Sequence, residues 1–190
     1  MDPAQRSATY DDVLAAPEHL VAEIVAGTLY TNPRPASPHA HAASTLGMDL
    51  GSPFHRGRGG PGGWWILDEP ELHLGADVLV PDLAGWRRER MPAVPDTAWF
   101  ELAPDWICEV VSPSTGRLDR TAKMPVYARE GVAFAWLVDP LQRTLEVFAL
   151  RDRHWVLLAT HAESERVRAE PFAAVELELG ALWLSADSAR

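Results

Sequence analysis

Two acidic residues stand out because each lies in an apolar stretch with the character of a short strand. Asp82 closes the run 78–82, and Glu109 lies inside the run 106–111. A carboxylate among β-branched and aromatic neighbours is costly to bury unless something compensates its charge. We therefore expect both acids to have a partner, which is a metal ion, a lysine or a hydrogen-bond network.

The chemistry that suits such a pair is metal-assisted hydrolysis of a phosphodiester. This reaction needs a cation to offset phosphate charge and to generate hydroxide at neutral pH. Mg²⁺ takes oxygen ligands, typically one or two carboxylates with water completing the set. If the strands carrying Asp82 and Glu109 are neighbours, both carboxylates converge at one sheet edge. Lys123 follows Asp119 by four residues on a predicted helix, so their side chains share a face.

The pattern of apolar residues and turn signals places these side chains on a mixed α/β sheet with helices against it. Pro125 is expected to kink the helix that carries Lys123, because proline lacks the backbone N–H of a helical residue. Helices are predicted over 9–16, 39–50, 114–130 and 177–184; strands over 64–67, 71–74, 77–83, around Ile107, and over 134–139, 144–150 and 154–160; a strand pair with a glycine turn over 22–30; and a loop over 51–63.

Length and composition indicate one ordinary globular domain. The chain has 190 residues, of which 47% are apolar and 23% charged, enough for a core without disulfides. Its single cysteine, Cys108, is expected to be a small core residue, which suits a reducing cytoplasm. No signal peptide and no apolar run long enough to span a membrane are visible. We expect a cytoplasmic protein with no membrane partner.

The net charge of −10 argues mildly against nonspecific binding to polyanions. An acidic protein can still bind nucleic acid if its cationic groups gather on one face. Two cationic clusters follow the two acids, and solvated surface arginines are an equally good interpretation of them. The clusters are Arg87, Arg88 and Arg90, and Arg117, Arg120 and Lys123.

These residues resemble the Uma-type family of bacterial putative restriction endonucleases, within the PD-(D/E)xK nuclease superfamily. The similarity runs from about Tyr10 to Leu184. It rests on Val80-Pro81-Asp82, on Glu109-Val110-Val111-Ser112-Pro113-Ser114-Thr115, on Asp119-Arg120 with Lys123 and Tyr127, on Gly131-Val132, on Trp136-Leu137-Val138-Asp139-Pro140, and on the opening hairpin that begins at Glu23.

The resemblance implies a restriction-endonuclease-like fold and a DNA substrate. We also expect a homodimer, because two symmetric sites easily cut both strands of a duplex. Asp82 and Glu109 would bind Mg²⁺ or Mn²⁺, with the Val110 carbonyl as a further ligand. The simplest superfamily pattern has a lysine two residues after the second acid, where this chain has Val111. The resemblance moves that role to Lys123 and adds Glu23 as a further acid of the site.

Each candidate also has a purely structural interpretation. Asp82 suits a turn after Pro81, Glu109 an internal ion pair, and Lys123 and Glu23 solvated surfaces. His39 and His41 open a predicted helix, where packing roles are more common than a phosphate contact. The eight tryptophans are interpreted as core and interface residues, with 62–67 as a candidate dimer contact. A catalytically inactive nuclease fold used for binding or assembly is therefore the alternative function.

Overall fold

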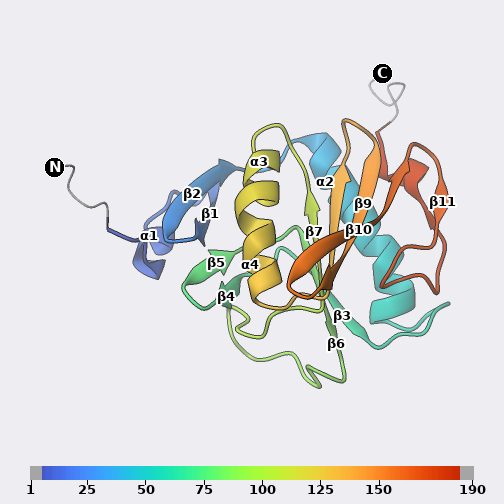
Figure 1. The fold of residues 1–190 in the computed structure, drawn as a ribbon, viewed down its shortest axis with the longest axis horizontal. Helices are drawn as coiled ribbons and strands as arrows, with labels where there is room; N and C mark the ends of the chain where they lie inside the picture. Colours follow the sequence, from blue (N-terminus) through green and yellow to red (C-terminus); the bar gives the residue numbers. More distant parts are fainter. Residues whose placement is uncertain (1–5, 185–190) are drawn as a thin grey trace.

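The computed structural model describes residues 6–184. Its strands form two main sheets, of six and four strands, and a small pair (Figure 1). The six-stranded sheet has the order β10 (His154–Ala162), β9 (Thr144–Arg151), β8 (Phe134–Asp139), β7 (Trp106–Val110), β6 (Leu83–Arg87), β3 (Trp64–Asp68). The four-stranded sheet has the order β2 (Thr28–Pro33), β1 (Leu20–Val25), β5 (Asp77–Leu79), β4 (Leu72–Leu74), and β11 (Arg166–Val167) pairs with β12 (Leu177–Glu178).

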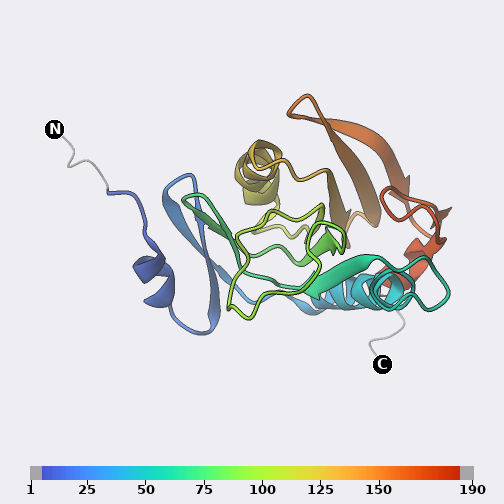
Figure 2. The same ribbon diagram turned by 90° about the horizontal axis from the view of Figure 1, so that it is seen from below.

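Helices cover both faces of the six-stranded sheet (Figure 2). On one face lies α2 (Ser37–Leu50), which continues into the π-helical turn η1 (Gly51–His55). On the other face lies one continuous helical segment made of α3 (Gly116–Leu118), the π-helical turn η2 (Asp119–Lys123) and α4 (Met124–Arg129). The short helix α1 (Tyr10–Leu14) precedes β1, and the 3₁₀ turn η3 (Leu179–Leu182) follows β12. Within residues 6–184, no helix is long and apolar enough to cross a membrane.

The central strand β7 is buried on both faces, and its side chains alternate between two cores. Trp106, Cys108 and Val110 pack in the cluster that includes α2. Ile107 packs in the cluster that includes α4. Because successive side chains of a strand point to opposite faces, Glu109 shares the face of Ile107 and lies beneath the helical segment. The buried, unpaired Cys108 confirms its prediction as a core residue.

The helical segment crosses from β7 to β8, which run parallel. The prediction of one helical segment here is correct. The irregularity expected at Pro125 is present as a change in helix type. The chain adopts the π-helical turn η2 directly before the α-helical turn that contains the proline. Wider turns of this kind are frequent at functional sites, and this one contains the buried Asp119 and Lys123.

The prediction of a single strand over 77–83 is wrong. β5 ends at Leu79 in the four-stranded sheet, and β6 begins at Leu83 in the six-stranded sheet. The three residues between them carry the chain from one sheet to the other, and Pro81 among them has no N–H to offer to a ladder. Asp82 therefore lies at the junction of the sheets rather than at the end of a strand.

The closing helix predicted over 177–184 is shorter in the structure. This stretch begins as the strand β12, and only the 3₁₀ turn η3 is helical. Five tryptophans are buried in the core, which agrees with their interpretation: Trp64, Trp86, Trp106, Trp136 and Trp183. Within the segment 62–67, Trp64 is buried and Trp65 is partly covered, and a dimer contact there stays a prediction.

Candidate active site

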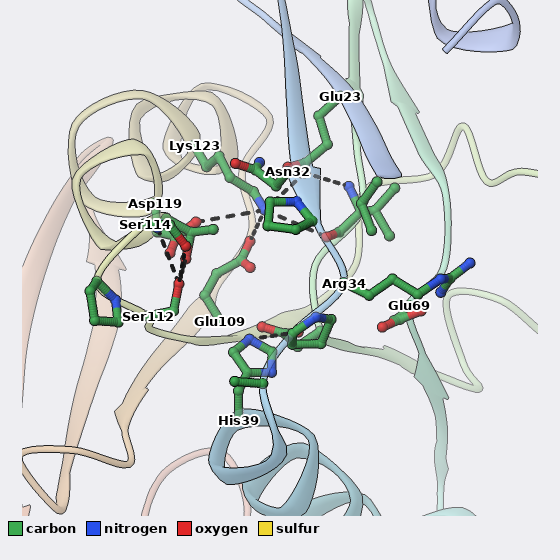
Figure 3. Close-up of a pocket in the computed structure, with 18 residues that line it drawn as sticks. Glu23, Asn32, Arg34, His39, Glu69, Glu109, Ser112, Ser114, Asp119 and Lys123 are labelled. Carbon is green, nitrogen blue, oxygen red and sulfur yellow. Dashed lines mark hydrogen bonds and ion pairs between the residues drawn. The ribbon is translucent and has the colours of Figure 1, made fainter. Parts of the chain in front are cut away.

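A pocket of about 320 Å³ opens where the two sheets meet the helical segment. Glu23 reaches it from β1, Glu109 from β7 and Lys123 from η2 (Figure 3). Asp82 reaches it from the junction between β5 and β6. All four residues singled out in the sequence thus line one cavity. The convergence of Asp82 and Glu109 follows from the pairing of β6 with β7, in which Leu83 lies opposite Cys108.

Lys123 lies at the centre of the carboxylates. Its Nζ is 2.8 Å from Glu23 Oε1, 2.9 Å from Glu109 Oε1 and 3.9 Å from Asp119 Oδ1. Only 3% of the side chain is exposed, so the interpretation of Lys123 as a solvated helix residue is wrong. One further signal was available in the sequence, since Lys123 is the only lysine of the whole chain.

The junction 80–82 is held by the same charged groups. The Val80 N–H donates to Glu23 Oε1 at 2.8 Å, and the Val110 N–H donates to Asp82 Oδ2 at 2.7 Å. The first bond ties the junction to the four-stranded sheet, and the second ties it to β7 in the six-stranded sheet. Glu23 is therefore a buried residue that joins the two sheets, and its interpretation as a surface charge is wrong.

Two further residues orient the acids. Tyr127 donates its hydroxyl to Glu109 Oε1 at 2.6 Å and is fully buried. His39 Nε2 lies 3.3 Å from Asp82 Oδ1, whereas His41 bonds the Ala181 carbonyl and has the packing role expected of it. The position of Tyr127, four residues after Lys123 on the same helical segment, is the signal that associates it with the site.

Burial and mutual repulsion perturb the pKa values of the cluster. Burial raises the pKa of Glu109 well above its usual range, although Lys123 opposes the shift. Burial likewise raises the pKa of Asp119 to about 6, again against Lys123. Burial alone would lower the pKa of Lys123, but Glu109, Glu23 and Asp119 outweigh it, and its pKa lies well above the ordinary value. Lys123 is therefore a permanent ammonium group.

One ammonium does not neutralise this cluster. With Asp82 included, the cluster has four carboxylates against the single charge of Lys123, and Glu69 also lines the pocket. Burial lowers the pKa of His39. The hydrogen bond to Asp82 and the nearby negative charges together raise this pKa by more than burial lowers it, so the pKa of His39 lies above its ordinary value. The remaining negative charge favours proton uptake or a further cation. Strongly perturbed groups gathered in one cavity are typical of functional sites.

The donors suit a hard divalent cation. Asp82 Oδ1 faces the pocket beside His39, and among residues 6–184 no hydrogen bond reaches Oε2 of Glu109. Mg²⁺ needs only one or two carboxylates because it keeps several water ligands. The described residues include no group of three or more His, Cys, Asp or Glu side chains arranged around a metal position. That Asp82 and Glu109 bind such an ion stays a prediction.

The arginines that follow Asp82 lie outside the pocket. Arg87 and Arg88 stack on the rings of Trp64 and Trp65, with the guanidinium carbon 4.7 and 3.8 Å from the ring centroids. Arg90 pairs with Asp105, and Arg120 pairs with Glu146. In the part of the chain that the structure describes, Arg34 is the only arginine lining the pocket, and the sequence interpretation had not singled it out.

Comparisons with known proteins give a family match and a structural match. A family model described as "Uma2: Putative restriction endonuclease" matches residues 8–182. Among solved structures, the chain resembles a putative nuclease belonging to DUF820 from Anabaena variabilis, with a TM-score of 0.72 and 23% identity. The alignment covers 92% of this chain and 97% of the Anabaena chain. The comparison with curated proteins finds no match. The restriction-endonuclease-like fold class expected from the sequence is confirmed.

Proposed function

Because this chain belongs to the Uma2 family of putative restriction endonucleases, we propose that it is a metal-dependent endonuclease that hydrolyses phosphodiester bonds of DNA. The observation that carries the proposal is the buried cluster in which Glu23, Glu109 and Asp119 surround Lys123, with Asp82 beside it. Burying so many carboxylates around one lysine costs stability. Clusters of ionisable groups with strongly perturbed pKa values are typical of functional sites.

Asp82 and Glu109 are the residues that would hold Mg²⁺ or Mn²⁺, through the oxygens that face the pocket. A bound ion of this kind offsets phosphate charge and lowers the pKa of its water. Lys123 supplies a second, permanent positive charge next to Glu109, where it can stabilise charge that develops on the phosphate. No proton has to leave this ammonium for that role.

The surrounding residues keep this arrangement rigid. Tyr127 holds Glu109 through Oε1, which leaves Oε2 directed to the pocket. The Val110 N–H fixes one oxygen of Asp82, and His39 lies against the other. Glu23 restrains the ammonium of Lys123 and the junction 80–82 together. Groups preorganised in this way need little rearrangement during the reaction.

Cleavage of DNA by the purified protein tests the proposal. We expect cutting in Mg²⁺ or Mn²⁺, none in EDTA, and none with Asp82→Ala. Asp96→Ala is the matched control, since Asp96 is exposed and does not line the pocket. Thermal unfolding of both variants shows that they are folded. Metal-dependent cutting that persists in Asp82→Ala would refute the assignment.

The second candidate function is a catalytically inactive nuclease fold used for binding or assembly. The observation in its favour is that Lys123 already bridges Glu23 and Glu109, so its ammonium occupies the centre of the carboxylates. Calorimetric titration with Mg²⁺ separates the two functions. Binding that is lost in Glu109→Ala supports the nuclease, whereas no binding, or equal binding in Glu109→Ala, supports the inactive fold.

We also propose a homodimer in the cytoplasm. Two symmetric copies of one active site are a simple means to cut both strands of a duplex where it has been opened. Sedimentation velocity measures the mass directly, and a monomer at every concentration would contradict the dimer.

A further inference from the structure

Most of the groups that would meet the phosphate are buried in the wall of a small cavity. The side chains of Glu23, Glu109 and Lys123 are each at most 4% exposed. The cavity of about 320 Å³ is at the lower end of the roughly 300–1,000 Å³ typical of small-molecule sites. A phosphate must therefore enter the protein to reach these groups, instead of lying on an open surface.

Two chain segments wall the mouth of this pocket (Figure 3). One wall is 32–36, which leads from β2 into α2, and the other is 112–115, which leads from β7 into α3. Both walls contain proline, and Ser112 bonds Ser114 and Thr115 within the second wall. These contacts stiffen the rim. A regular duplex is a stiff rod over about 150 base pairs, so its backbone does not bend into such a mouth.

The charges around the pocket also disfavour a duplex. Tight duplex binding depends on several lysine or arginine contacts to phosphates. Among residues 6–184, the lining carries five acids, and Arg34 is its only exposed cation. The arginine cluster 87–90 is engaged with Trp64, Trp65 and Asp105 outside the pocket. The pocket can therefore attract only a few phosphates at a time.

Resting on the proposed nuclease function, we infer that the site acts on an unpaired stretch of DNA strand and not on an intact duplex. An unpaired strand is flexible enough to insert one phosphate past the rim, with Arg34 at the mouth and Lys123 at the base. Among the described residues, the lining includes no Phe, Tyr or Trp on which a base would stack. The strand is therefore held by its backbone, and cutting depends little on base sequence.

The test offers one labelled oligonucleotide to the wild-type protein in Mn²⁺ as a single strand, as a full duplex, and as a duplex with an unpaired bubble. The single strand and the bubble should be cut. The full duplex should be cut about 100-fold more slowly, because it must first open about two base-pair steps at roughly tenfold each. Duplex cut as fast as the single strand, with activity still dependent on Asp82, would overturn the inference and leave the nuclease function intact. If no form is cut, both fail.

Arg34→Ala provides a second measurement. For the single strand we expect KM to rise about fivefold with kcat unchanged, and the slope of log affinity against log salt to fall by about one. Arg58→Ala is the matched control, since Arg58 is exposed and lines a different cavity. Equal KM values and equal salt slopes in the two variants would overturn the passage of the strand through this mouth.

Discussion

Replacing Lys123 with methionine removes the one positive charge at the centre of the cluster and keeps most of the side-chain volume. Glu23 and Glu109 would then each lose a contact shorter than 3 Å in a site that is almost fully buried. Breaking a buried ion pair by removal of one partner typically costs about 3–5 kcal/mol. For a chain of this size, each kcal/mol lowers the Tm by about 2–4 °C. We therefore expect the Tm at pH 8 to fall by roughly 10 °C.

The pH dependence identifies charge as the cause. Burial already raises the pKa of Glu109 and of Asp119, and loss of the ammonium raises both further. At pH 5 these carboxyl groups take up protons, so the penalty for the missing charge shrinks. Lys123→Met should therefore be much closer to the wild-type Tm at pH 5 than at pH 8.

Differential scanning calorimetry at both pH values provides the measurement. Arg120→Met is the control, because Arg120 is 41% exposed in its pair with Glu146 and such pairs contribute less than about 1 kcal/mol. A Tm of Lys123→Met within about 2 °C of the wild type at pH 8 would refute the reasoning. If Lys123→Met lowers the Tm equally at pH 5 and pH 8, the destabilisation arises from packing and not from the missing charge.

Three further variants test the groups around Lys123. Because the pKa of Asp119 is raised from 3.8 to about 6, the stability of the wild type should fall as pH rises from 4 through 6. Asp119→Asn should then be more stable at pH 8 by up to about 3 kcal/mol in urea unfolding, and an unchanged pH profile would contradict this. Tyr127→Phe should cost about 1–3 kcal/mol, since Glu109 loses a buried donor, and no loss would make that bond dispensable. His39→Ala should weaken Mg²⁺ binding about 10–100-fold in calorimetry, and equal affinity would exclude His39 from supporting Asp82.

Local patterns in the sequence predicted most of the elements. The meander β8–β10, the hairpin β1–β2 and the helix α2 lie close to their expected positions, because alternation and turn residues depend on neighbours in the chain. The prediction failed over 77–83, where one apolar run contains two strands. An apolar run indicates that its residues are buried. It does not indicate that its two halves belong to two different sheets.

The candidate site shows the same division. The sequence was sufficient to single out Asp82, Glu109, Lys123 and Glu23, since acids in apolar strands need partners and since their order resembles a known family. It left open the interpretation of Lys123 and Glu23 as surface charges. It associated Tyr127 only with the family pattern and left a packing role for His39.

What the sequence determined by itself was the residue types, the period of each strand and helix, and the need of buried acids for compensation. Only the tertiary structure decided which groups compensate the charge of each buried acid. Glu23 meets the junction 57 residues away, and Asp82 meets Val110 across 28 residues. The physical reason is that local propensities act over a few residues, whereas the chain exchanges sheets at Val80-Pro81-Asp82. That exchange brings carboxylates from two sheets around the only lysine of the protein.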